Sequence, residues 1–233
     1  MGKGGTALIG QLVTVPGGRG KAEPGRLYGL SVLRAEADPT GFWGERRLRR
    51  AGKGLRQGGA IRVLVPGDFD LWPALAPLGL RPVEVDAFVR NQSAPLALEL
   101  LERRDVPPDR AVVALRGARA DRDMARTAAA LCQEVRGLVV DAPRGGEELA
   151  NWLRREFGIP VLPPGEGSHA ALCFHPDCPR REGEVLELYG PRPRLAGLAL
   201  SVPRLAEEDR ENLPLLSALW EGGKLGPEDI KIT

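Results

Sequence analysis

The segment SHAALCFHPDC, residues 168–178, concentrates the side chains best suited to chemistry, because it holds both histidines and two of the three cysteines. Thiolate sulfur and imidazole nitrogen are the usual ligands of zinc. If the segment is a strand at about 3.3 Å per residue, His169 and Cys173 lie roughly 13 Å apart and do not share an ion. Cys173 and His175 then lie on one face about 7 Å apart, and the following Pro-Asp turn brings Cys178 towards them. A metal site would therefore use Cys173, His175 and Cys178, with a fourth ligand from elsewhere.

The alternative interpretation of this segment is structural, and we favour it over a zinc site. The spacing matches no standard zinc pattern, and structural zinc sites usually pair two short ligand knuckles. The same residue types also fit an edge strand in which Cys173 is buried and His175 is half exposed. Nucleophilic catalysis needs a base beside a thiol or hydroxyl, and neither histidine belongs to a recognisable motif. The sequence predicts no specific reaction and leaves open whether the protein is an enzyme.

The composition is that of a globular protein with a sizeable core. The chain has 233 residues, 42% of them hydrophobic and 27% charged, which is ordinary for such proteins. Of the 33 basic residues 28 are arginine, a bias typical of a GC-rich bacterial genome. Three cysteines do not make a disulfide framework and favour a reducing compartment. There is no signal-peptide pattern and no apolar run of roughly 18 residues, so we expect a cytoplasmic protein with no membrane partner.

Charge separates the first quarter of the chain from the rest. Residues 1–60 carry 11 basic and four acidic side chains, whereas residues 61–233 carry 22 and 27. This asymmetry indicates a separate N-terminal unit. The β-rich runs at 7–15 and 26–36 predict a hairpin with a long Gly/Pro/Arg loop.

A short helix is expected to follow at 44–59, with Leu48, Ala51 and Leu55 on one side. The other side is basic, and the residues that make it a candidate polyanion surface are Arg46, Arg49, Arg50 and Lys53. Such a face is usually solvated, and otherwise it binds nucleic acid or another polyanion. Few aromatic side chains accompany it beyond Phe42 and Trp43, which argues against stacking on single-stranded bases.

From residue 60 onwards, short apolar strands alternate with helices. The segments AIRVLVP, RAVVALRG, RGLVVDAP and IPVLP predict a parallel sheet with right-handed crossovers. After residue 164 the alternation stops, and AALCFHP and EVLELYG are expected to pair as antiparallel edge strands. We therefore predict an α/β fold with three segments: a basic β-hairpin and helix at 1–59, a Rossmann-like core at 60–164, and an antiparallel extension with a helix packed on the core at 165–233.

Ligands of open parallel α/β sheets bind beyond the carboxyl ends of the strands, at helix N-termini that attract anions. Glycine there lets the backbone approach a phosphate closely. Three loops follow predicted strands, and their candidate ligand-binding residues are Gly67 and Asp68 in the first, Arg116, Gly117 and Arg119 in the second, and Asp141, Gly145 and Gly146 in the third. The alternative is that these are ordinary turn and cap residues.

The stretch from AIRVLVPGDFDLWP to EFGIPVLP resembles the Rossmann-like cores of uncharacterised bacterial proteins. More distantly, it resembles the cofactor domains of shikimate-dehydrogenase and glutamyl-tRNA-reductase type enzymes. The resemblance covers about 105 residues and lies in the pattern rather than in a motif. It implies an NAD(P) cofactor, although VPGDFD replaces the glycine fingerprint after the first predicted strand. No catalytic residue is carried over.

Three functional hypotheses follow from the sequence. The first is a non-catalytic binding or regulatory protein for a nucleotide, another small phosphorylated ligand or a protein partner. The second is an NAD(P)-dependent oxidoreductase, which requires the loops at 116–122 and 141–146 to lie at one end of the sheet. The third is a protein or nucleic-acid adaptor that acts through the basic helix at 44–56.

Overall fold

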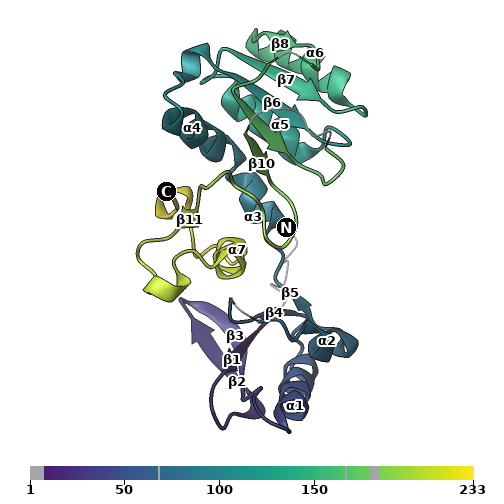
Figure 1. Cartoon of the computed structure of the whole chain (residues 1–233), viewed down its shortest axis with the longest axis vertical. Helices are drawn as coiled ribbons and strands as arrows, with labels where there is room; N and C mark the ends of the chain where they lie inside the picture. Colours follow the sequence, from purple (N-terminus) through teal and green to yellow (C-terminus); the bar gives the residue numbers. More distant parts are fainter. Residues whose placement is uncertain (1–7, 68, 166, 179–183) are drawn as a thin grey trace, which may run out of the picture. The chain divides into compact units, whose positions relative to one another are not determined.

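The computed structural model describes residues 8–67, 69–165, 167–178 and 184–233, which form two compact units (Figure 1). The first unit comprises the residues up to Glu84 together with Val202–Ile230, and the second comprises Val85–Ser201 and Lys231–Thr233. The expected boundaries were at residues 60 and 165. The observed division differs because the strand that follows residue 60 pairs with an N-terminal strand instead of starting a new sheet.

The first unit is built on a five-stranded sheet in the order β2-β3-β1-β4-β5. Neighbouring strands are parallel except for β2 and β3, which are antiparallel. The strands are β1 (Ile9–Thr14), β2 (Arg19–Leu27), β3 (Leu30–Ala37), β4 (Arg62–Leu64) and β5 (Arg81–Pro82).

The predicted hairpin between 7–15 and 26–36 is wrong. These segments become β1 and β3, which are neighbours but run parallel, with Ile9 opposite Val32. The antiparallel partner of β3 is β2, formed by the segment expected to be a loop. Tyr28 and Gly29 connect the two strands with φ of 48° and 82°, as a type I′ turn requires. The strand was missed because β2 is an exposed edge strand with little apolar patterning.

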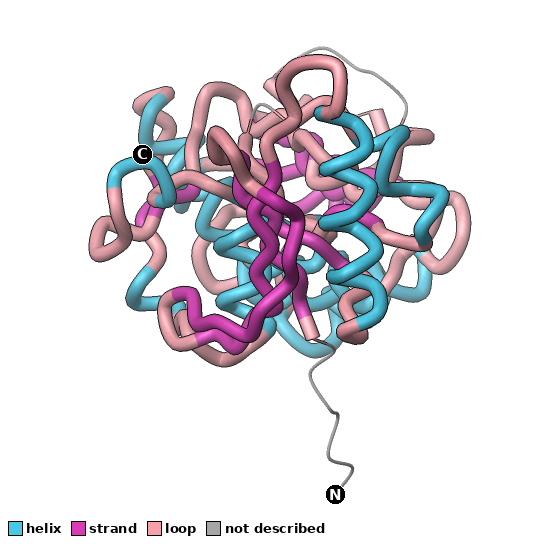
Figure 2. Tube along the Cα trace, turned by 90° about the horizontal axis from the view of Figure 1, so that it is seen from below, coloured by secondary structure: helices cyan, strands magenta, loops and turns pink. Residues whose placement is uncertain are grey.

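Helix α1 (Gly44–Gln57) packs against β2 and β3 (Figure 2). Leu48, Ala51 and Leu55 are buried against the sheet, which confirms the predicted apolar side. Two short helical segments, α2 (Trp72–Leu75) and the 3-10 turn Ala76–Leu78, and the later helix α7 (Leu213–Glu221) complete the main elements of this unit.

The second unit contains a five-stranded sheet in the order β10-β9-β6-β7-β8, in which every neighbouring pair is parallel. Its strands are β6 (Val112–Arg116), β7 (Gly137–Asp141), β8 (Val161–Leu162), β9 (Ala170–Cys173) and β10 (Val185–Glu187). Its helices are α3 (Asp86–Asn91), α4 (Ser93–Arg103), α5 (Arg122–Leu131) and α6 (Gly146–Phe157). The predicted α/β fold with a Rossmann-like parallel sheet flanked by helices is confirmed.

The predicted antiparallel pairing of β9 with β10 is wrong. Both strands run parallel to β6, and β9 lies directly beside it. All four residues of β9 are buried, as expected for a strand inside a parallel sheet covered on both faces. Antiparallel pairing near the C-terminus joins β11 (Leu200–Ser201) to β12 (Lys231–Ile232) instead.

This strand order creates a topological switch point. From β6 the chain adds β7 and β8 on one side, and it then returns to add β9 and β10 on the other side of β6. In open α/β sheets, ligands bind outside the carboxyl ends of the strands at such a reversal. A ligand is therefore expected beyond the carboxyl ends of β6 and β9. Within the described ranges, no helix is long and apolar enough to cross a membrane.

Candidate nucleotide-binding site

Arg116 is the last residue of β6, so it lies at the switch point. Its register neighbours are Asp141 at the end of β7 and Cys173 at the end of β9; we call this end of the sheet the carboxyl edge. The Arg116 side chain is buried, with 4% of the residue exposed. Its Nε and Nη1 have no hydrogen-bond partner among the described residues. Buried guanidinium donors are normally satisfied, so these two donors of Arg116 are an exception.

The loop after β6 is tied to the loop after β7. The backbone N–H of Gly117 donates to the carbonyl of Asp141 at 3.1 Å, and that of Ala120 donates to the carbonyl of Arg144 at 2.8 Å. Asp121 is the N-cap of α5, and its Oδ1 accepts a hydrogen bond from the backbone N–H of Met124 at 2.9 Å. The two predicted loops therefore form one surface.

A cavity adjoins the loop after β7. Gly145 has a φ of 75°, a left-handed conformation that favours glycine, and it directly precedes α6. The cavity has a volume of about 430 Å³, within the range of small-molecule sites. Residues that line it include Asp141, Ala142, Gly146, Asn151, Leu162 and Pro163.

His175 covers the glycine of the first loop. A Cβ atom on Gly117 would lie 2.6 Å from His175 Nδ1, so the ring packs directly on this glycine. His175 Nε2 lies 3.5 Å from Asp121 Oδ2, while Nδ1 is buried and has no partner within the described part of the chain. The main chain before the ring is held in place, because the Phe174 carbonyl accepts from Arg90 Nη2 at 2.6 Å.

The thiols of Cys173 and Cys178 lie close to Arg116. The hydrogen bond from Cys173 lowers the pKa of Cys178, helped by the backbone N–H groups of His175 and Phe174 and by the charge of Arg116, whereas burial opposes the shift. The hydrogen bond to Cys178, with burial, raises the pKa of Cys173. Cys178 is therefore the sulfur of this pair that carries negative charge more readily.

The three predicted ligand loops belong to two different sheets. The second and third lie together at the carboxyl edge, as the oxidoreductase hypothesis also required. Gly67 follows β4, which belongs to the sheet of the first unit, and Asp68 lies outside the described residues. Arg119 is exposed on the second loop.

The carboxyl edge contains residues that the sequence interpretation placed elsewhere. The segment with Cys173 and His175 was assigned to an extension, because the direction of β9 cannot be inferred from an apolar run. Across residues 8–67, 69–165, 167–178 and 184–233, no group of three or more His, Cys, Asp or Glu side chains could hold a metal ion. Cys173, His175 and Cys178 do not form such a group.

A dinucleotide fits this site poorly. With β6 as the first strand of the sheet, the G-x-G-x-x-G positions correspond to Gly117, Arg119 and Arg122. The later glycines of that fingerprint let a pyrophosphate approach the backbone and a helix pack on a strand, and here both are arginine. His175 also covers Gly117. Asp141, by contrast, ends the second strand, where an acidic residue can bind ribose hydroxyls.

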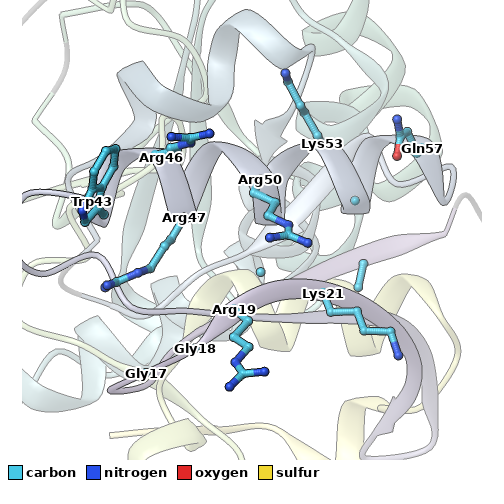
Figure 3. Close-up of a pocket in the computed structure, with 13 residues that line it drawn as sticks. Gly17, Gly18, Arg19, Lys21, Trp43, Arg46, Arg47, Arg50, Lys53 and Gln57 are labelled. Atoms are coloured by element: carbon cyan, nitrogen blue, oxygen red, sulfur yellow. The ribbon is translucent and has the colours of Figure 1, made fainter.

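The basic residues predicted on the first helix lie in the other unit. Arg46, Arg50 and Lys53 line an open groove between α1 and β2 (Figure 3). Arg49 does not line the groove and forms an ion pair with Glu45 at 2.7 Å.

Comparison with known proteins adds little to this geometry. No protein-family model matches the chain, and no curated protein matches its sequence. Among solved structures, L-tryptophan dehydrogenase from Nostoc punctiforme aligns with 71% of this chain at 12% identity and a TM-score of 0.30. The alignment spans 54% of that dehydrogenase chain. The fold assignment therefore rests on the strand order itself.

Proposed function

We propose that this protein is a binding or regulatory protein for a small phosphorylated ligand of the nucleotide class, held at the carboxyl edge of the second sheet. The observation that carries the proposal is the buried Arg116, whose Nε and Nη1 have no partner among the described residues, at the switch point of the sheet. Charge-assisted hydrogen bonds from guanidinium to phosphate are among the stronger polar contacts in proteins.

Each part of a mononucleotide has a counterpart at this edge. Arg116 and the exposed Arg119 supply positive charge for the phosphate. Asp141 supplies a carboxylate for ribose hydroxyls. The adjoining cavity of about 430 Å³ is large enough for a base. We infer binding rather than catalysis because none of the described residues that line this cavity is a histidine, cysteine, serine, threonine or lysine.

An NAD(P)-dependent oxidoreductase is the second candidate. It is favoured by the position of both loops at one end of a Rossmann-like sheet. Arg119 and Arg122 at the fingerprint positions and His175 over Gly117 argue against it. We therefore place a mononucleotide or sugar phosphate ahead of a dinucleotide.

Isothermal titration calorimetry of matched arginine variants tests the proposal. The ligands are AMP, ADP, ribose 5-phosphate, NAD⁺ and NADP⁺. Arg119→Ala removes an exposed charge at the carboxyl edge, whereas Arg136→Ala removes an exposed charge beside the start of β7, at the opposite end of the same sheet. We expect wild type and R136A to bind AMP or ADP equally and R119A to bind about tenfold more weakly, because a charged hydrogen bond contributes about 1.5 kcal/mol.

Two results would overturn this assignment. If none of the five ligands binds, or if R119A and R136A lose the same affinity, the carboxyl edge is not a phosphate site. If NAD⁺ or NADP⁺ binds at least tenfold more tightly than every mononucleotide, the dinucleotide candidate replaces the present one.

A further inference from the structure

A groove in the first unit lies between α1 and β2 and has a volume of about 1060 Å³ (Figure 3). Along α1 the lining side chains recur at intervals of three or four residues, which places them in one stripe. The stripe consists of Trp43, Arg46, Arg50, Lys53 and Gln57. The facing strand contributes Arg19 and Lys21 to the lining, but their side chains extend away from α1 (Figure 3). The positive side chains of the groove therefore come mainly from α1.

Small residues form the floor of this groove. Gly20 has a φ of 73°, and a Cβ atom there would lie 2.9 Å from both the Ala51 nitrogen and the Arg47 oxygen of α1. A Cβ atom on Gly54 would lie 3.1 Å from that of Ala22. Helix and strand thus meet almost backbone to backbone, and the long basic side chains of α1 extend beside this contact. This arrangement makes an open channel instead of a flat basic surface.

Most of the positive charge of the groove is not neutralised. No acidic residue is among its described lining residues. Lys21 pairs with Glu23 at 2.7 Å and Arg47 pairs with Asp38 at 3.2 Å. The remaining four cations form no ion pair with any residue that the structure describes; they are Arg19, Arg46, Arg50 and Lys53. The last three lie along α1, and such a row of unpaired cations attracts a linear polyanion.

An exposed aromatic pair stands at one end of the basic stripe. Trp43 is 52% exposed and Phe42 is 91% exposed, and their rings lie 5.0 Å apart in an edge-to-face arrangement. The Arg46 guanidinium lies 5.4 Å from the Trp43 ring centre. Burying an aromatic ring is favourable, so this exposure needs a reason. Aromatic faces beside a basic channel are the means by which proteins stack unpaired bases.

The geometry points to single-stranded nucleic acid as the occupant of this groove. Arg50 and Lys53 contact the phosphates, and Trp43 stacks on a base at the end of the channel. A polyanion without bases would use the same cations but would gain nothing from the tryptophan. This second site belongs to the first unit and is independent of the proposed nucleotide site.

Fluorescence anisotropy with labelled 12-nucleotide U and dT oligomers tests the inference on the full chain. A length of 12 lies within the range of about 4–16 nucleotides that single-strand sites occupy. Trp43→Ala should weaken binding about tenfold, since stacking contributes roughly 1–3 kcal/mol per base. Arg50→Ala should weaken binding and reduce the slope of log K against log salt by about 0.7. Arg49→Ala is the matched control on the same helix and should change neither quantity.

Other polyanions test whether the groove prefers single-stranded nucleic acid. Heparin and inorganic polyphosphate, which lack bases, should bind more weakly than the oligomers and should not respond to W43A. A 12-base-pair duplex should also bind more weakly. Equal losses in R49A and R50A, no effect of W43A on the oligomers, or tighter binding of heparin or duplex would overturn the assignment. Circular dichroism melts of the variants confirm that each remains folded.

Discussion

The three cysteines of this chain differ in their electrostatic surroundings, and that difference governs their chemistry. Burial alone raises the pKa of Cys132 to about 11. The pKa of Cys178 is lowered instead, because the Cys173 thiol, backbone hydrogen bonds and Arg116 stabilise its thiolate. Since the thiolate is the reactive form of cysteine, we expect Cys178, which lies near the proposed ligand site, to react fastest of the three.

Alkylation rates should separate these thiols. At pH 7.5 we expect iodoacetamide to modify Cys178 at least tenfold faster than Cys132, because a larger fraction of Cys178 is ionised. The rate at Cys132 should rise about tenfold per pH unit until the pH approaches 11. Peptide mass spectrometry of samples quenched over time measures both rates. Faster modification of Cys132 at pH 7.5 would contradict this ordering.

At the scale of elements, the close approach of α1 to β2 depends on glycine. Gly17 and Gly20 both have positive φ, of 74° and 73°, but their surroundings differ. No atom lies within 4 Å of a Cβ built on Gly17, whereas one on Gly20 would meet the backbone of α1 at 2.9 Å. A comparison of the two positions therefore distinguishes the energetic cost of backbone strain from the cost of disturbed packing.

Substituting alanine at each position provides a matched pair. Gly17→Ala should cost about 1 kcal/mol, because an L-residue resists the left-handed conformation. Gly20→Ala should cost about 3 kcal/mol or more, because α1 must also move away from β2. Urea unfolding measures both free energies. Equal destabilisation by the two substitutions would show that α1 does not pack on β2 this closely.

Asp38 joins the turn before β2 to the segment that leads into α1. The Thr40 hydroxyl, the backbone N–H groups of Gly17 and Thr40, and Arg47 lower its pKa from 3.8 to about 2. Because the folded pKa lies below the unfolded value, the carboxylate stabilises the fold above pH 3.8 and loses this effect as the pH falls through about 2.

Asp38→Asn should therefore unfold at a lower temperature than wild type at pH 7. The difference between the two melting temperatures should shrink as the pH falls from 4 and become small near pH 2, where about half of the Asp38 carboxyl groups in the folded protein are protonated. Thermal melts at pH 7, 4 and 2 provide the comparison. A difference that stays constant over this range would rule out the carboxylate as its source.

Sequence patterns predicted local elements better than strand partners. Leu48, Ala51 and Leu55 identified the buried side of α1 because helical spacing is a local property. The apolar run that ends at Cys173 contained no information on direction, since a strand buried on both faces has the same pattern in either orientation. His175 was consequently separated from Arg116 and Asp121. The position of β2 beside the basic helix α1 likewise depends on long-range contacts, which no local pattern predicts.

At the scale of the whole molecule, neither unit is a continuous stretch of chain. The first unit ends with Val202–Ile230, whose helix α7 buries Leu215, Leu216 and Leu219. Glu221 of that helix accepts from Arg62 Nη1 at 2.6 Å. Residues 60–164, expected from sequence to form the core, instead contribute strands to both sheets and lack β9, the neighbour of β6.

A fragment of residues 60–164 should therefore not fold by itself. It exposes one edge of β6 and separates β4 from β1, so much of its apolar surface has no partner. Circular dichroism should show no cooperative thermal transition for the fragment, whereas the full chain should show one. A cooperative transition in the fragment would mean that these residues form an independent domain.

Hydrogen–deuterium exchange of the full chain with saturating ADP tests the proposed function most directly. We expect slower exchange at residues 116–121 and 141–146, where the loops after β6 and β7 meet, and no change at residues 108–112 at the opposite end of the sheet. Slower exchange confined to other segments, or none anywhere at an ADP concentration that saturates the calorimetric signal, would contradict a nucleotide site at the carboxyl edge.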